Sequence, residues 1–119
     1  MTDPRFDDKP LAMLRRVGRE SLARKMTDLF LGSAAGRVAA IAAAHAAGDL
    51  PTVGRTAHSL KPSAGQLGAV ALQSVCQEIE EAATIGDVAA VGALLPRLAE
   101  EFSATDAWLR AGTSAPSTE

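Results

Sequence analysis

The chain has 119 residues, which is enough for one compact domain and too few for two of ordinary size. Its formal net charge is −2, and basic residues adjoin only in the pairs Arg15–Arg16 and Arg24–Lys25, which argues against a nucleic-acid-binding protein. No apolar run approaches the roughly 20 residues that cross a bilayer, and residues 1–10 lack the apolar segment of a signal peptide.

The polar ends and the single cysteine set further expectations. Residues 1–10 predict a flexible leader, and the Ser/Thr/Pro-rich residues 112–119 predict a disordered tail, so residues 11–111 should form the domain of a free-standing protein. Cys76 has no second cysteine for a disulfide or a zinc site. We therefore expect no metal, no cofactor and a reduced, cytoplasmic location.

Composition and periodicity predict helices along the whole chain. Aromatic residues make up only 3% of the sequence, and much of the apolar content is alanine, which favours helices. Apolar residues recur at steps of three and four in series that begin at Leu11. Breaks that contain glycine separate these series, at Gly18, Gly32–Ser33, Gly48–Asp49, Gly68 and Gly86–Asp87. Ser33 should cap the helix that follows it.

One-sided helices must bury their apolar stripes against one another, and short connections favour antiparallel neighbours. The predicted fold is therefore all-α, an up-and-down antiparallel four-helix bundle with one or two short N-terminal helices. Pro62 and Pro96 fall inside predicted helices. Each proline removes a backbone hydrogen bond, so a kink or a break is expected at both positions.

The helix expected over about residues 49–67 carries an exposed histidine. At about 100° per residue, His58 projects away from the apolar stripe of this helix. Lys61 at i+3 is its neighbour on the helix surface, as are Gly54 at i−4 and Gly65 at i+7. Glycine costs about 1 kcal/mol relative to alanine inside a helix. The two glycines therefore suggest that something large approaches His58 closely.

These features match the needs of a histidine that accepts a phosphoryl group. Such a residue requires an exposed, unprotonated ring nitrogen, a nearby positive charge and flat surroundings on which a donor protein can dock. His58, Lys61 and their small neighbours supply all three. The sequence has no Gly-rich phosphate loop, so the chain is not expected to bind ATP or to act as a kinase. The residues alone leave open a plain solvated histidine on a helical scaffold.

A longer run supports the phosphoryl-acceptor interpretation. Residues 57–69, AHSLKPSAGQLGA, resemble the A-H-x-L-K-G-S-A-x-x-L/V-G-A signature of histidine-containing phosphotransfer domains. Residues 13–16, 46–49 and 85–87 resemble the opening helix and two turns of the same family, so the resemblance covers about residues 11–109. It implies a helical, non-enzymatic carrier that takes a phosphoryl group from the aspartate of one receiver domain to that of another in a bacterial two-component phosphorelay.

The resemblance also implies roles for individual residues. His58 would be the phosphoryl acceptor, through Nε2, and Lys61 would support the charge of the phosphate. Glu80, on the following helix, would orient the ring, and the alternative is that Glu80 is a solvated surface residue. The docking face around His58 would include Gly54, Arg55, Pro62 and Gly65. The expected partners are receiver domains of a hybrid histidine kinase or of response regulators, which would bring the Mg²⁺. Nucleic acid and membrane are not expected partners, and the chain is expected to be a monomer.

Pro62 departs from the family pattern, which usually has glycine there. Pro62 therefore leaves an alternative function open. In this alternative the chain binds and sequesters a receiver domain but transfers the phosphoryl group poorly. The other histidine, His45, shares a face with apolar residues and is interpreted as structural. Cys76 is expected in the core, and Trp108 is expected to close the end of the bundle.

Overall fold

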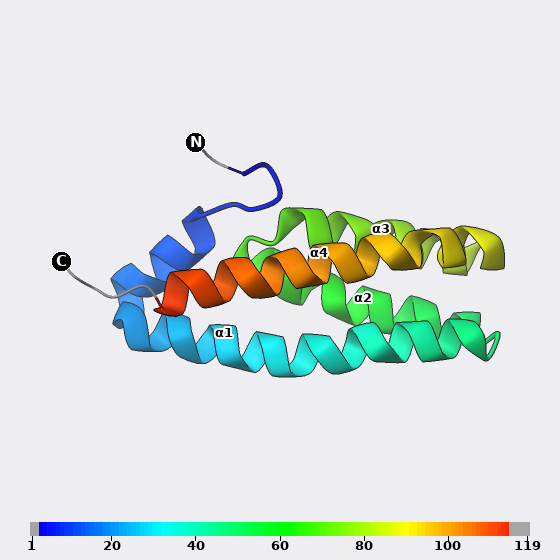
Figure 1. Ribbon diagram of the computed structural model, residues 1–119, viewed down its shortest axis with the longest axis horizontal. Helices are drawn as coiled ribbons and strands as arrows, with labels where there is room; N and C mark the ends of the chain where they lie inside the picture. Colours follow the sequence, from blue (N-terminus) through cyan, green and yellow to red (C-terminus); the bar gives the residue numbers. More distant parts are fainter. Residues whose placement is uncertain (1–2, 115–119) are drawn as a thin grey trace.

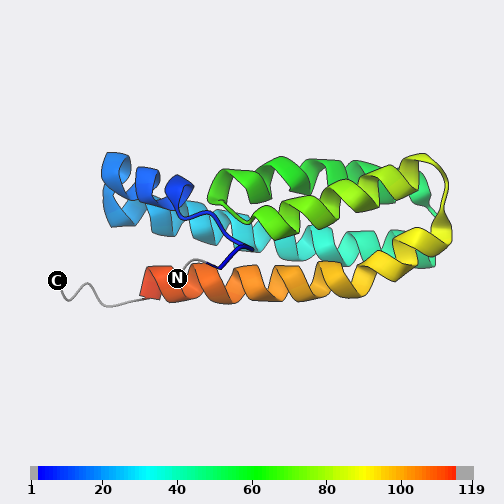
Figure 2. The same cartoon turned by 90° about the horizontal axis from the view of Figure 1, so that it is seen from above.

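The computed structural model describes residues 3–114, with side chains as far as residue 112, and places four helices in chain order (Figure 1). These are α1 (Lys9–Ala46), α2 (Leu50–Leu67), α3 (Val70–Thr84) and α4 (Val88–Ser114). Each helix packs against two others, because contacts join α1 to α2, α2 to α3, α3 to α4 and α4 to α1. Consecutive helices run in opposite directions (Figures 1 and 2), so the predicted antiparallel four-helix bundle is confirmed.

The first turns of α1 form a short N-terminal helix beyond a sharp turn (Figure 1). At the turn, Arg19 has φ 67° and ψ −172°, a conformation that costs energy for a residue with a Cβ. A Cβ added to the preceding Gly18 would clash with the side chain of Leu22, so glycine lets Leu22 pack into the turn. The predicted break at Gly18 and the predicted short N-terminal helix are both confirmed.

The predicted break at Gly32–Ser33 is wrong, because α1 continues through both residues and Ser33 is not a helix cap. Phe30, Leu31 and Ala34 are buried on either side of this pair. The burial of a large apolar side chain contributes about 1.5–3 kcal/mol, which exceeds the cost of one exposed glycine in a helix.

The other predicted breaks are confirmed by capping geometry. Asp49 precedes α2 and accepts a hydrogen bond from Thr52 N at 3.2 Å, and Asp87 accepts one from Ala90 N at 3.0 Å. Gly68 ends α2 with φ 89°, the left-handed conformation that glycine adopts at helix ends. The turns therefore fall where glycine and aspartate predict them.

Both internal prolines are accommodated without a break in the helix. Pro62 and Pro96 lie inside α2 and α4, are exposed, and are followed by further helical turns. The sequence predicts a kink or a break at each proline, and the break does not occur at either one. Figure 2 shows that the first turns of α4, in yellow, are inclined to the orange remainder, as a kink at Pro96 would produce.

Residues 3–8 pack against the bundle, which differs from the flexible leader expected from the sequence. Phe6 is only 8% exposed and stacks on Trp108, with ring centroids 4.3 Å apart and an interplanar angle of 9°. The backbone N–H of Asp7 donates to the carbonyl of Gly68 at 2.7 Å. Trp108 thus lies near the end of the bundle, as expected, and the aromatic stack explains why the segment is ordered. A lone aromatic residue has no periodic partner that could have revealed this contact.

The two ends of the chain differ in how far the structure tests them. Residues 112–114 belong to α4, so the helix extends beyond the start of the predicted tail. Residues 1–2 and 115–119, which the sequence assigns to the leader and the tail, lie outside the described residues.

Helix α1 is long and apolar enough, by length and composition, to cross a membrane, although no run of this kind was expected from the sequence. Its most apolar window has a mean hydropathy of 1.3, and 28% of that window is buried. Many of its apolar residues are alanines, which raise the mean hydropathy without adding large side chains. In the bundle α1 packs against α2 and α4, and Ile41 is fully buried.

The core fixes the rotation of each helix about its axis. In α2 the predicted stripe is buried at Val53, Ala57, Leu60, Ala64 and Leu67. In α3 the buried face includes Ile79 and Cys76, which confirms Cys76 as a core residue. The residues between these positions therefore point outward or toward the edges that α2 and α3 share with neighbouring helices.

Candidate functional site

His58 lies on the outer side of α2. Its neighbour Ala57 and the stripe residue Leu60 are fully buried, whereas the His58 side chain is 67% exposed. The buried stripe thus turns His58 toward solvent, as its helical position predicts. A partner protein can reach the ring without any rearrangement of the core.

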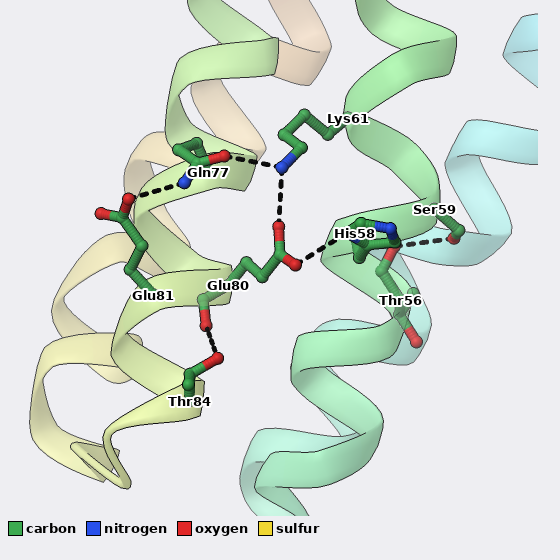
Figure 3. A network of polar contacts seen from close by, with 8 residues as sticks. All are labelled: Thr56, His58, Ser59, Lys61, Gln77, Glu80, Glu81 and Thr84. Atoms are coloured by element: carbon green, nitrogen blue, oxygen red, sulfur yellow. Dashed lines mark hydrogen bonds and ion pairs between the residues drawn. The ribbon is translucent and has the colours of Figure 1, made fainter.

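Glu80 comes from α3 and holds one side of the ring (Figure 3). Its Oε2 lies 2.7 Å from His58 Nδ1. Ile79, next to it, is buried against the core, so Glu80 lies at the edge between α2 and α3. An ionised carboxylate can only accept hydrogen bonds, so Nδ1 carries the proton and donates it. In the neutral ring Nε2 then has a free lone pair, which is the form that a nucleophile needs.

Lys61 binds the other oxygen of the same carboxylate. Its Nζ lies 2.9 Å from Glu80 Oε1 and 2.6 Å from Gln77 Oε1. The Lys61 side chain is 25% exposed and that of Glu80 is 24% exposed, so the ion pair is partly shielded from water. Figure 3 shows Glu80 between the histidine and the lysine. The carboxylate therefore links the ring to a positive charge.

This arrangement lowers the pKa of Glu80 below its ordinary value. The hydrogen bond from Lys61 is the largest cause, and partial burial opposes it. The hydrogen bond from His58 and the nearby positive charges lower the pKa further. Glu80 is therefore ionised at neutral pH, which keeps it an acceptor for Nδ1–H.

An open surface hollow adjoins the ring between α2 and α3. Besides His58 and Glu80, its lining consists of small, apolar or cationic residues: Leu50, Pro51, Gly54, Arg55, Ala83 and Thr84. The exposed Arg55 donates to Thr52 Oγ1 at 3.0 Å. The hollow offers an apolar surface with one cation beside the histidine.

The two glycines near His58 have different surroundings. A Cβ added to Gly54 would lie 3.5 Å from Ala83 Cβ, an ordinary contact at the edge of the hollow. A Cβ added to Gly65 would lie 2.6 Å from Gln73 Nε2, so the flexible side chain of Gln73 would have to shift. Gly65 therefore lies beside a side chain of α3, and the close approach of an outside protein at Gly65 stays a prediction.

The structure brings His58, Lys61 and Glu80 into one network and adds Gln77, which sequence reasoning missed. Arg55 and Gly54 lie beside this network in the hollow, and Pro62 is exposed elsewhere on α2. Gln77 and Glu80 are three residues apart and so share a face of α3. That spacing could have suggested Gln77, but only once the register between α2 and α3 was known.

The two other candidate nucleophiles, His45 and Cys76, are less accessible than His58. His45 is half-buried, and its Nε2 lies 3.1 Å from the carbonyl oxygen of Val88 at the start of α4. Burial raises the pKa of Cys76 to about 12, so its thiol stays protonated. Within residues 3–112, no group of three His, Cys, Asp or Glu side chains could hold a metal ion.

Comparisons with known proteins find a family and a solved structure that are similar to this chain. The family model of the Hpt domain matches residues 25–108. The crystal structure of histidine-containing phosphotransfer protein B (HptB) from Pseudomonas aeruginosa PAO1 matches with a TM-score of 0.89 and 30% sequence identity. This match covers 97% of the present chain and 99% of the other. No curated protein matches the sequence.

Proposed function

Because the chain belongs to the Hpt domain family and is a histidine phosphotransfer protein of a phosphorelay, we propose that its phosphoryl carrier is His58 Nε2. The observation that supports this assignment is the 2.7 Å contact between His58 Nδ1 and Glu80 Oε2 on a ring that is 67% exposed. That contact leaves Nε2 as the unprotonated nitrogen. His45, in contrast, is half-buried and contacts a backbone carbonyl through its own Nε2.

In the proposed transfer, the lone pair of Nε2 attacks the phosphorus of a phospho-aspartate on a receiver domain. A P–N bond forms, the P–O bond to the aspartate breaks, and the aspartate leaves as a carboxylate. The imidazole ring becomes positively charged while Nδ1 keeps its proton, and the carboxylate of Glu80 stabilises that charge. The reverse steps, with the aspartate of a second receiver as nucleophile, pass the phosphoryl group on.

Lys61 supplies positive charge to the phosphoryl group, which carries close to two negative charges. The partner receiver domain supplies Mg²⁺ and most of the transition-state stabilisation. In this division of labour the chain needs no ATP site of its own. We therefore assign it carrier activity without kinase activity.

The docking surface we propose is the hollow beside His58, with Gly54 and Arg55 in its lining and Pro62 on the exposed side of α2. Its partners would be receiver domains of a hybrid histidine kinase and of response regulators. We propose that the chain acts as a monomer, because one exposed histidine can serve both partners in turn. We propose the cytoplasm as its location.

The assignment is tested by labelling with a phosphorylated, radiolabelled receiver domain. His58→Gln should abolish transfer of label to this chain, whereas the matched variant His45→Gln should keep it. The label should be stable to alkali and released by acid, as expected for a phosphoramidate. Equal labelling of the wild type and His58→Gln would refute the assignment.

A further inference from the structure

The ammonium of Lys61 has two acceptors, and only one of them is charged. Gln77 Oε1 lies 2.6 Å from Nζ, and Glu80 Oε1 lies 2.9 Å from it (Figure 3). An ammonium has three N–H donors, so these two contacts leave one donor for a further acceptor. The lysine is thus already held at the edge between α2 and α3 before any phosphoryl group arrives.

The amide of Gln77 is itself oriented by the next turn of α3. Its Nε2 donates to Glu81 Oε2 at 2.6 Å, which turns its oxygen toward Lys61. Figure 3 shows the resulting series of contacts, from Glu81 through Gln77 and Lys61 to Glu80 and His58. Gln77 is half-buried, so its contact with the lysine is partly protected from competing water.

A neutral acceptor suits this position for an electrostatic reason. Lys61 and Glu80 together carry no net charge, and the amide of Gln77 leaves that balance unchanged. A carboxylate at position 77 would add a negative charge close to an incoming phosphoryl group and repel it. An apolar side chain there would leave the flexible lysine attached to Glu80 alone.

We propose that Gln77 is a positioning residue for phosphoryl transfer. It holds the Lys61 ammonium beside Glu80, so that the remaining N–H can bind an oxygen of the phosphoryl group on His58. Gln77 forms no covalent bond and does not touch the reacting atoms, so it acts through Lys61. This inference rests on the proposed role of His58 as the acceptor.

A double-mutant cycle tests whether Gln77 acts through the lysine. Wild type, Gln77→Ala, Lys61→Met and the double variant are each mixed with a saturating radiolabelled phospho-receiver, and the single-turnover labelling rate is measured. Gln77→Ala should slow labelling about tenfold when Lys61 is present, as expected for a hydrogen bond to a charged group. In the Lys61→Met background the same change should alter the rate by less than about twofold.

Two further measurements separate positioning from damage to the fold or to docking. The affinity for the unphosphorylated receiver should be the same for wild type and Gln77→Ala. The matched control is Gln73→Ala, four residues earlier on α3, where the side chain packs beside Gly65. This control should label at the wild-type rate. If Gln77→Ala does not fold, Gln77→Asn replaces it, because its amide is one methylene too short to reach Lys61.

The outcomes distinguish this inference from the assignment of His58. An unchanged rate in Gln77→Ala, or an equal loss with and without Lys61, would overturn the role of Gln77 while His58→Gln still abolished labelling. A drop in receiver affinity that accounts for the slower labelling would overturn it as well. Label retained by His58→Gln would instead contradict the proposed function itself.

Discussion

His58 and Glu80 are 22 residues apart in the chain, yet His58 Nδ1 and Glu80 Oε2 lie 2.7 Å apart across the contact between α2 and α3. The other oxygen of the carboxylate binds Lys61. One side chain of α3 therefore sets the tautomer of the ring and holds the neighbouring positive charge. Replacing single members of this group should separate the two effects.

Glu80→Gln should slow labelling by a phospho-receiver without removing it. The amide can still bond to Nδ1, but it lacks the charge that stabilises the positive ring formed as the P–N bond is made. A hydrogen bond to a charged group contributes about 1.5–3 kcal/mol, which predicts a loss of about tenfold or more in rate. The measurement is the single-turnover labelling rate, with Glu78→Gln on the same helix as the control. A wild-type rate in Glu80→Gln would show that the charge is not used.

The same carboxylate should give stability a pH dependence. Glu80 has a pKa below its ordinary value of 4.5, so the folded protein holds its proton less tightly than the unfolded chain. Its contribution is therefore fully present above pH 4.5 and is lost as the pH falls through the lower pKa of the folded state. Urea unfolding of wild type and Glu80→Gln should show a difference at pH 7 that shrinks below pH 4.5. A difference independent of pH would contradict the ion-paired geometry.

The buried stripe of α2 was predictable because helical spacing alone decides which side faces the core. The exposure of His58 follows from that stripe. The partners of His58 are harder to predict, because they depend on how α3 is set against α2. Glu80 was predicted only through the family resemblance. Gln77 was not predicted, because nothing in its sequence neighbourhood distinguishes it from other polar residues of α3. Long-range contacts of single side chains need the packed structure.

Phe6→Ala tests another contact that periodicity could not reveal. The ring is nearly buried and stacked on Trp108, so its removal should cost about 2–4 kcal/mol of unfolding free energy. Met13→Ala, a truncation at a half-exposed residue, should cost within about 0.5 kcal/mol. Chemical denaturation measures both. Because the stack lies outside the His58 network, labelling by a receiver should be unchanged in Phe6→Ala. A loss of less than about 0.5 kcal/mol would show that residues 3–8 are not held by this stack.

Pro62 gives the last prediction, because it is the residue of the motif that departs most from the family pattern. Proline has no N–H, so the carbonyl of His58 lacks its usual partner four residues later. The structure nevertheless continues α2 past Pro62, which is exposed, while Leu60 and Ala64 stay buried on the opposite side. The altered backbone therefore faces water, where the free carbonyl can be hydrated.

Pro62→Gly should restore the hydrogen bond, but glycine is itself a poor helix former. The expected gain in unfolding free energy is about 1–2 kcal/mol. Because the contacts of His58 with Glu80 and of Lys61 with Gln77 are made by side chains, both proteins should accept label from a receiver at similar rates. Pro62→Ala, with a larger gain in stability and the same rate, is the matched control. A wild type that binds a receiver but transfers poorly, with transfer recovered in Pro62→Gly, would show that this proline suppresses the relay.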